Sequence, residues 1–427
     1  MPEELRRDVR DLAVRTARLD HDPDPIAVAG HDGVFFGRRG RSLAGRGVAG
    51  RIALTGAARV PGSACRIVED ALGSMPVQDE VGLPGCGPVA FGALPFDPSA
   101  DTELVIPEIL VGRSEDGTRW VSTTGPASDE GCHDRMVDEL LSVCADVSVP
   151  AAPIAVDLSV RSCRDSQDWC RSVADARDDL RAGLADKVVL AREVLVTTSS
   201  EISAMQTLDR LRSSYPGCIL YSLLGFVGAS PELLVARSGD IVRSHPMAGS
   251  TPRSADPSVD ARLAAALLAS TKDREEHRIT IDMVHDTLLP WCSYLDEEAD
   301  PSVVAVANVQ HLATMVEGRL SSPPASVIEL MTALHPTPAV CGFPREAALD
   351  LIRRHEHLDR GRYGGPVGWV DAAGNGEWAV GIRCAEIAGS TARLFAGVGV
   401  VADSDPLTEL AETQTKLLAM LSAIIRP

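Results

Sequence analysis

The chain has 427 residues, of which 41 are basic and 60 acidic, and its formal net charge is −19. This charge argues against a nucleic-acid partner, because binding a polyanion needs a cationic face. The composition, 45% hydrophobic and 24% charged, is typical of a globular chain. We expect no membrane partner and no secretory signal, since the sequence has neither a run of about 18 uncharged apolar residues nor an apolar core near its start.

The ten cysteines are scattered, and none forms a Cys-x-x-Cys pair. A zinc ribbon or a thioredoxin-type centre is therefore not expected. Scattered cysteines in a long chain are more often small buried hydrophobic residues in a reducing compartment. The pattern predicts a cytoplasmic protein.

In the first third of the chain, short apolar runs such as 89–94 predict strands separated by Gly and Pro, and 147–157 has the Pro- and Ala-rich composition of a connector. The pattern then sharpens. It predicts a helix over 165–185 and strands over 187–197, 218–224, 226–236 and 241–247.

The second half continues with a long helical region over 258–295 and strands within 303–320. Helices are predicted over 324–333 and 344–355, strands over 366–371, 377–388 and 392–402, and a last helix over 406–424. Clusters of strands separated by long helices favour a large α+β domain with mostly antiparallel sheets.

Two helical segments each carry a pair of carboxylates spaced three apart: Asp273 with Glu276, and Glu409 with Glu412. Residues at this spacing share a helix face, and clusters of oxygen ligands alone suit Mg²⁺. A second interpretation stays open. On a helical wheel, Glu409, Glu412 and Lys416 lie opposite a leucine stripe, as a solvated polar face does.

Lys187 opens an apolar strand, and Glu232 stands just inside another. A lysine acts as a base near neutral pH only where burial or neighbouring charges favour its neutral form. Both residues are either exposed charges or groups held inside for chemistry. The residues by themselves favour exposure at both positions.

Two glycine-rich stretches, at Gly249-Ser250 and at Gly397 to Gly399, follow or interrupt strands. Such glycines mark either a bulge or the close approach of a ligand. Arg383, in an apolar strand, suits either a carboxylate ligand or a structural ion pair.

Ten ordered segments resemble the chorismate-utilising enzymes, the family of isochorismate, salicylate, anthranilate and aminodeoxychorismate synthases. They lie in the family's order across about 260 residues, and GALPFDP (92–98) extends the likeness toward the beginning of the chain. The segments are KVVLAR (187–192), GASPELL (228–234), HPMAGSTPR (245–253), KDREEH (272–277), VQHL (309–312), LHPTPAVCGFP (334–344), RGRYGGPVGW (360–369), GIRCAE (381–386), AGVGVVADSDP (396–406) and ELAETQTK (409–416).

The resemblance implies one α+β domain over residues 1–427, with two packed, mostly antiparallel β-sheets flanked by helices and a site in the cleft between the sheets. Residues 1–150 would form an N-terminal lobe, and residues 158–424 the catalytic core that carries the motifs. The implied small-molecule substrate is chorismate, and the family's isochorismate synthases lead us to expect a monomer.

The resemblance also assigns roles. Lys187 would be the base and Glu232 the acid, while Glu276 and Glu412 would hold a Mg²⁺ ion, with Asp273 and Glu409 completing the acidic surround. Asp273 replaces a glutamate of some relatives. The polar face of the last helix would then point into the cleft. The substrate-binding residues implied by the resemblance and by neighbouring motif positions are Gly249, Ser250 (usually threonine), His311, Ala333, Leu334, His335, Tyr363, Arg383, Gly397, Gly399 and Lys416.

Within the family, the chain is most similar to isochorismate synthase. Lys187 matches the water-using members, Ala248 replaces the nucleophilic lysine of many aminodeoxychorismate synthases, and 333–337 is like isochorismate synthases. The expected reaction is reversible attack of water at C2 of chorismate with loss of the C4 hydroxyl. Salicylate synthase, an ammonia-using enzyme and a non-catalytic chorismate-binding subunit remain alternatives. Siderophore, menaquinone or salicylate pathways could use the product.

Overall fold

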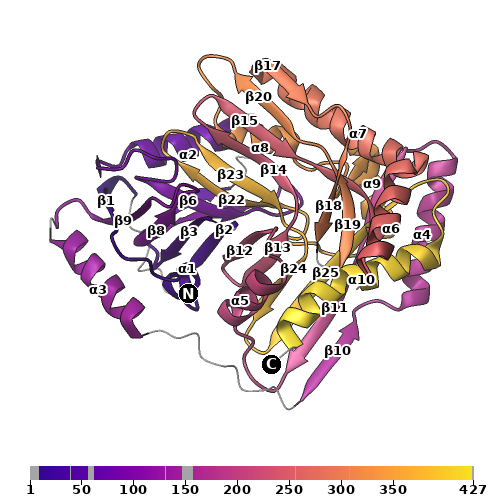
Figure 1. The fold of residues 1–427 in the computed structure, drawn as a ribbon, viewed down its shortest axis with the longest axis horizontal. Helices are drawn as coiled ribbons and strands as arrows, with labels where there is room; N and C mark the ends of the chain where they lie inside the picture. Colours follow the sequence, from indigo (N-terminus) through magenta and orange to yellow (C-terminus); the bar gives the residue numbers. More distant parts are fainter. Residues whose placement is uncertain are drawn as a thin grey trace.

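The computed structural model describes residues 9–38, 40–55, 62–129, 131–146, 157–254, 256–306 and 308–425. Its strands form two large sheets and one small sheet, with helices around them (Figure 1). Of the predicted connector, only Asp157 lies within the described residues. Among those residues, none of the helices is long and apolar enough to cross a membrane.

Within the described residues, the largest sheet has 13 strands, and its pairs are antiparallel except for β1 with β5. The strand order is β10 (Leu158–Ser162), β11 (Lys187–Thr198), β25 (Thr391–Val400), β24 (Cys384–Ala388), β13 (Phe226–Ser230), β12 (Ile219–Leu223), β2 (Val34–Arg38), β3 (Arg41–Arg46), β8 (Ile109–Arg113), β9 (Arg119–Pro126), β1 (Leu12–Arg18) and β5 (Val77–Asp79), with β21 (Gly342–Phe343) beside β11.

Of the strands in the described part of the chain, nine form the second sheet and three form the third. The nine are β17 (Cys292–Glu297), β20 (Val316–Leu320), β15 (Ile241–His245), β14 (Leu233–Ser238), β23 (Gly376–Val380), β22 (Pro366–Asp371), β6 (Val89–Ala93), β7 (Thr102–Ile106) and β4 (Gly50–Leu54). The three are β16 (Met247–Pro252), β19 (Val309–Ala313) and β18 (Ser302–Val306). Strands from the first 150 residues therefore belong to both large sheets.

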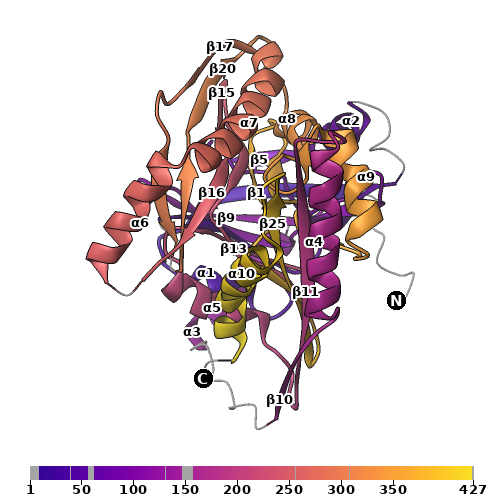
Figure 2. The ribbon, with the colours of Figure 1, turned by 90° about the vertical axis from the view of Figure 1, so that its right-hand side faces the viewer.

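Helices cover the sheets, with α4 and α9 along one side of the molecule and α6 and α7 along the other (Figure 2). The helices are α1 (Pro25–Ala29), α2 (Ser63–Gly73), α3 (Cys132–Asp146), α4 (Ser166–Arg181), α5 (Ala204–Ser214), α6 (Pro257–Ala269), α7 (Thr271–Leu288), α8 (Val327–Leu334), α9 (Arg345–His355) and α10 (Pro406–Ile425), with short 3₁₀ turns at Val9–Asp11 and Leu289–Trp291.

The two large sheets share hydrophobic clusters. In one of them, Phe36 and Tyr221 from the 13-stranded sheet lie with Phe91 and Trp369 from the nine-stranded sheet, and all four are buried. Apolar side chains of facing sheets that pack in this way hold the sheets against each other. The predicted α+β class with packed, mostly antiparallel sheets is confirmed.

Three predicted elements were wrong in extent. The 226–236 strand is two strands, β13 and β14, which belong to different sheets. The 377–388 strand likewise divides into β23 and β24 of different sheets. The 258–295 helical region consists of α6 and α7, which meet at Ser270, whose hydroxyl caps α7, but its end is strand β17 and not helix. The two strand breaks matter most, because they place Glu232 and Arg383 where the chain crosses between sheets.

Candidate active site

A cavity of about 240 Å³ opens where β11 and β25 of the largest sheet and β16 and β19 of the smallest sheet meet α7 and α10. Most of the predicted site residues line it. Its walls are formed by Lys187, Val189, Pro231, Glu232, Met247, Ala248, Gly249, Ser250, Lys272, Asp273, Glu276, His311, Ala339, Val340, Tyr363, Ile382, Arg383, Gly397, Gly399, Thr408, Glu409, Glu412 and Lys416.

Lys187 begins β11 and reaches the cavity from inside the protein. It is 1% exposed, and its Nζ lies 2.8 Å from Oε1 of Glu276 on α7. A Cβ added to Gly399 would lie 2.8 Å from Cε of Lys187 and 2.9 Å from the same Glu276 oxygen. The glycine on β25 therefore leaves the space that this ion pair occupies.

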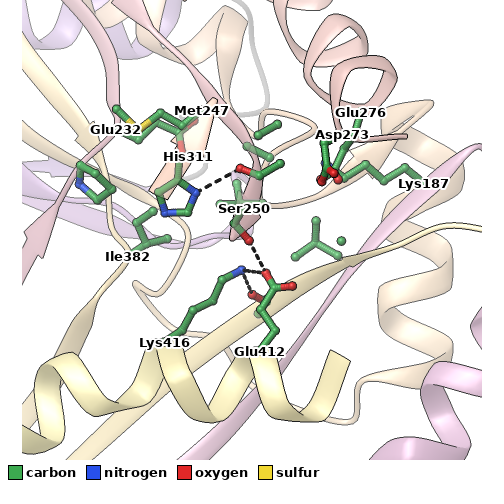
Figure 3. Close-up of a pocket in the computed structure, with 18 of the residues that line it drawn as sticks. Lys187, Glu232, Met247, Ser250, Asp273, Glu276, His311, Ile382, Glu412 and Lys416 are labelled. Atoms are coloured by element: carbon green, nitrogen blue, oxygen red, sulfur yellow. Dashed lines mark hydrogen bonds and ion pairs between the residues drawn. The ribbon is translucent and has the colours of Figure 1, made fainter. Parts of the chain in front are cut away.

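Glu232 lies in the crossover from β13 to β14, directly after Pro231, and is 3% exposed. Burial raises the pKa of its carboxyl to about 8, although Lys187, the Met247 N–H and Arg383 oppose the rise. The carboxyl is therefore largely protonated at neutral pH. Figure 3 shows Lys187 and Glu232 on opposite sides of the cavity.

Arg383 lies in the crossover from β23 to β24. Its backbone φ is 51°, a value that few residues other than glycine adopt. Its Nη2 donates to Nε2 of His311 over 3.1 Å, and Nδ1 of His311 lies 3.4 Å from the Gly249 carbonyl. Because a guanidinium can only donate, the ring is the neutral form with its proton on Nδ1. Burial and the Arg383 charge lower the pKa of His311 to about 3, which agrees with this assignment.

Tyr363 forms another wall and stacks on Phe395 with ring centroids 5.2 Å apart. Burial raises the pKa of its hydroxyl, so the phenol is a neutral hydrogen-bond donor. A Cβ on Gly397 would approach the Tyr363 hydroxyl to 2.7 Å. Both glycines of β25 are thus required by close neighbours in the cavity.

On α10, Glu412 accepts a hydrogen bond from the Ser250 hydroxyl over 2.8 Å and pairs with Lys416 over 2.7 Å (Figure 3). Burial opposes its ionisation, but Lys416 and Ser250 outweigh burial and lower the pKa of Glu412 to about 2. Nζ of Lys416 also donates to the Gly397 carbonyl over 2.9 Å. The polar face of α10 therefore lines the cavity, which rules out the helical-wheel interpretation.

The four carboxylates predicted to bind Mg²⁺ all line this cavity, two from α7 and two from α10. Burial raises the pKa of Glu409 to about 7, and the nearby Glu412 carboxylate adds to the rise. Among the described residues, no three His, Cys, Asp or Glu side chains converge as a ready-made metal site. Glu276 and Glu412 pair with lysines instead. The donor set itself, four carboxylates around one cavity, fits a hard cation such as Mg²⁺.

Three predicted substrate-binding residues, Ala333, Leu334 and His335, do not line this cavity, which corrects their expected place. They end α8, and the carbonyls of Ala333 and Leu334 accept hydrogen bonds from Arg345. The His335 ring donates to the Phe96 carbonyl over 2.9 Å. This segment therefore anchors the turn of the GALPFDP motif.

Sequence reasoning missed several lining residues. Ala339 and Val340 belong to the same motif as His335 but lie four and five positions further along, beyond the turn. Lys272, one residue before Asp273, lines the cavity too. Its place in the KDREEH motif was the one signal available for it.

Comparisons with known proteins agree with this geometry. The sequence profile of the family described as "Chorismate binding enzyme" matches residues 29–425. The chain belongs to the chorismate-binding enzyme family. This chorismate-binding enzyme is 36% identical to isochorismate synthase MenF of Bacillus subtilis over 359 residues, which cover 79% of this chain and 75% of that protein.

Two further similarities are close. The vibriobactin-specific isochorismate synthase of Vibrio cholerae is 37% identical over 343 residues, which cover 79% of each chain. The crystal structure of DhbC from Bacillus anthracis matches with a TM-score of 0.76 and 32% identity, over 95% of this chain and 97% of that one.

Proposed function

We propose that this chorismate-binding enzyme is an isochorismate synthase, which adds a hydroxyl group from water at C2 of the chorismate ring and removes the hydroxyl group at C4. One observation carries the proposal: a buried amine and a buried, protonated carboxyl, Lys187 and Glu232, line opposite sides of one cavity. Moving a hydroxyl requires a base for the incoming water and an acid for the departing group, and the cavity supplies both. The related isochorismate synthases support the same assignment.

In the proposed reaction, Lys187 in its neutral form takes a proton from a water molecule as the water oxygen bonds to C2. The ring double bonds shift, and the bond from C4 to its hydroxyl breaks. Glu232 gives its proton to that hydroxyl, which leaves as water. The atoms of substrate and product are the same, so the reaction is an isomerisation, and positioned acids and bases each contribute about 10²–10⁴-fold.

After one turnover Lys187 holds the extra proton and Glu232 has lost one. Exchange with solvent restores the starting state. The pKa of about 8 for Glu232 suits this cycle, because the carboxyl is protonated at neutral pH yet close enough to its titration point to release its proton. The protonated carboxyl of Glu232 thus supplies the proton that the departing hydroxyl needs.

The substrate carries two carboxylates, and the cavity offers several groups that can bind them. The Arg383 guanidinium, aligned by His311, and the Tyr363 hydroxyl are donors from one wall. A carboxylate that accepts from a guanidinium and a phenol is fixed in direction as well as position. These contacts would hold C2 and C4 between Lys187 and Glu232.

We also propose that Glu276 and Glu412 hold Mg²⁺ when the enzyme is active, with Asp273 and Glu409 around it. When bound, the ion supplies positive charge that orients the ring carboxylate of the substrate and screens it from these acidic side chains. Lys416 and Ser250 keep Glu412 ionised and aligned. Lys187 and Lys416 compensate part of the acidic charge in the structure described here.

We further propose that the enzyme acts as a monomer in the cytoplasm. The described cysteines are free, as suits a reducing compartment. The net charge of −19 disfavours nonspecific self-association.

One assay tests the function. Purified protein is incubated with chorismate, with and without Mg²⁺, and the products are separated by chromatography. Isochorismate in equilibrium with chorismate is the expected result. Salicylate together with pyruvate would identify a salicylate synthase, and an aromatic amine formed only with ammonia would identify an amine-forming enzyme, so either result contradicts the proposal.

A further inference from the structure

A buried ion pair next to the cavity stands apart from the groups that line it. Glu356 and Arg360 are 1% and 3% exposed in their side chains, and two N–H groups of Arg360 donate to the two Glu356 oxygens over 2.6 Å each. The guanidinium also lies 4.1 Å from the centre of the Phe96 ring. The positive charge of Arg360 is therefore balanced by Glu356 inside the protein.

The pair contacts the backbone of β11, the strand that carries Lys187. One edge of β11 pairs with β25 along nearly its whole length. The other edge pairs with β21 at Lys187 and Val188, and with β10 from Val194 onward. Within the described chain, residues 189–193 have no strand partner on that edge.

Side chains fill this gap. Arg360 Nη2 donates to the Val189 carbonyl over 2.8 Å, and the Ala191 N–H donates to Glu356 Oε2 over 2.7 Å. Arg360 Nη1 donates to the Val340 carbonyl over 2.7 Å, which ties the segment leading to β21 to the same point. The Val189 N–H donates to the Cys341 carbonyl over 2.8 Å, and the Trp169 indole donates to the Ala191 carbonyl over 3.1 Å. Together with these two bonds, the ion pair takes the place of a missing strand, two to four residues from Lys187.

Stability alone does not explain a charged pair here. Buried ion pairs can often be replaced by apolar residues without loss of stability, because taking two charges out of water is costly. An apolar pair, however, could not bond the backbone of β11 and of Val340 together. Both Val189 and Val340 line the cavity, so their positions bear directly on the geometry around Lys187.

We infer that Arg360 and Glu356 are positioning residues for the reaction, which fix β11 and the 340–343 segment so that the Lys187 amine meets the attacking water. The inference rests on the proposed function. A displacement of about 1 Å in a reacting group can cost on the order of 10²-fold in rate. Of the groups that hold the substrate, Arg383 and Ser250 have no recorded hydrogen bond to this pair. The Tyr363 N–H donates to the Arg360 carbonyl over 2.9 Å, a backbone bond that a side-chain substitution keeps, so substrate binding should change little.

The test compares Arg360→Lys with a matched control, Arg237→Lys. Arg237 is also buried and also donates to two carbonyls, those of Gly239 and Gly374, but it lies outside the cavity. Lysine keeps the charge and loses the planar fork. Each protein is assayed about 20 °C below its own melting temperature, and kcat is expressed per folded molecule from circular dichroism.

Arg360→Lys should lower kcat at least fivefold while KM for chorismate stays within threefold, and Arg237→Lys should leave both unchanged. A loss of kcat below fivefold, or a KM that rises instead of a kcat that falls, would overturn the inference. If Arg360→Lys does not fold, Glu356→Gln is judged by the same limits, since it removes the charge and keeps the shape. Parent protein that makes no isochorismate would refute the proposed function, whereas active parent with an equally active variant would refute only the positioning role.

Discussion

The Glu232→Gln variant should be more stable to unfolding than the parent protein and much less active. In the folded protein the carboxyl has a pKa of about 8, against an ordinary value of 4.5. At pH 7 the unfolded chain loses this proton and the folded chain keeps it, so folding must take up a proton. Each pH unit between the pKa of the unfolded chain, 4.5, and the pH of the solution is worth about 1.4 kcal/mol. At pH 7 the raised pKa of Glu232 therefore lowers the free energy of unfolding by about 3 kcal/mol.

The sign follows from the raised pKa. Below pH 4.5 both states hold the proton and the cost is absent; it grows as pH rises and levels off above pH 8. Glutamine has nearly the same shape and never ionises, so the variant escapes the cost. With an unfolding entropy of about 2.1 cal/mol/K for each of the 427 residues, about 3 kcal/mol corresponds to a rise of roughly 3 °C in melting temperature at pH 7.

Two measurements check this prediction. Melting curves of parent and variant should coincide near pH 4 and separate at pH 7 to 9, with the variant higher. Turnover of chorismate should fall by about 10²–10⁴-fold, because glutamine cannot donate the carboxyl proton. Melting temperatures that agree at every pH, or turnover within tenfold of the parent, would refute the assignment of Glu232 as a buried, protonated acid.

Three other predictions concern the remaining groups of the cavity. Lys187→Ala should lower turnover by about 10²–10⁴-fold with the circular dichroism spectrum unchanged, and turnover within tenfold of the parent would contradict its role as base. Gly399→Ala should lower kcat tenfold or more, because the new Cβ would displace Lys187 and Glu276. Gly73→Ala is the control, because a Cβ at Gly73 would point into open space. Equal effects of the two substitutions on kcat would contradict the prediction. Mg²⁺ should raise the melting temperature of the parent protein, and Glu412→Gln should need at least ten times more Mg²⁺ for the same rise. Equal Mg²⁺ titrations of parent and variant would show that Glu412 is not a metal ligand.

Local pattern predicted much of the fold. The strand expected at 187–197 is β11, and the helix expected at 406–424 is α10, within one or two residues. Their composition is strong enough that packing does not alter their type. The α+β class followed from the alternation of strand clusters and long helices.

The pattern could not reveal where the chain changes sheets. Residues 226–236 look like one strand, and alternation along that strand would turn Glu232 toward solvent. The strand ends at Ser230 instead, and Glu232 falls in the crossover between two sheets, where it is 3% exposed. Arg383 was obscured in the same way, because a crossover is a tertiary event without a period in the sequence.

The acidic pairs show the opposite case. Their spacing correctly indicated that each helix presents two carboxylates on one face. That α7 and α10 present them to one cavity depends on how distant parts of the chain pack. The resemblance to the family supplied that step, and the structure brings all four to the same cavity.

The attack of water on the ring is tested most directly with ¹⁸O-labelled water. Chorismate is incubated with the enzyme and Mg²⁺ in labelled water, and isochorismate is collected early, before the reverse reaction exchanges the substrate. If Lys187 activates a water molecule for attack at C2, the product should carry one ¹⁸O atom, at the C2 hydroxyl, and the unreacted chorismate should carry none. Isochorismate that forms without the label would mean that the original hydroxyl migrates within the substrate, which would contradict the roles given to Lys187 and Glu232.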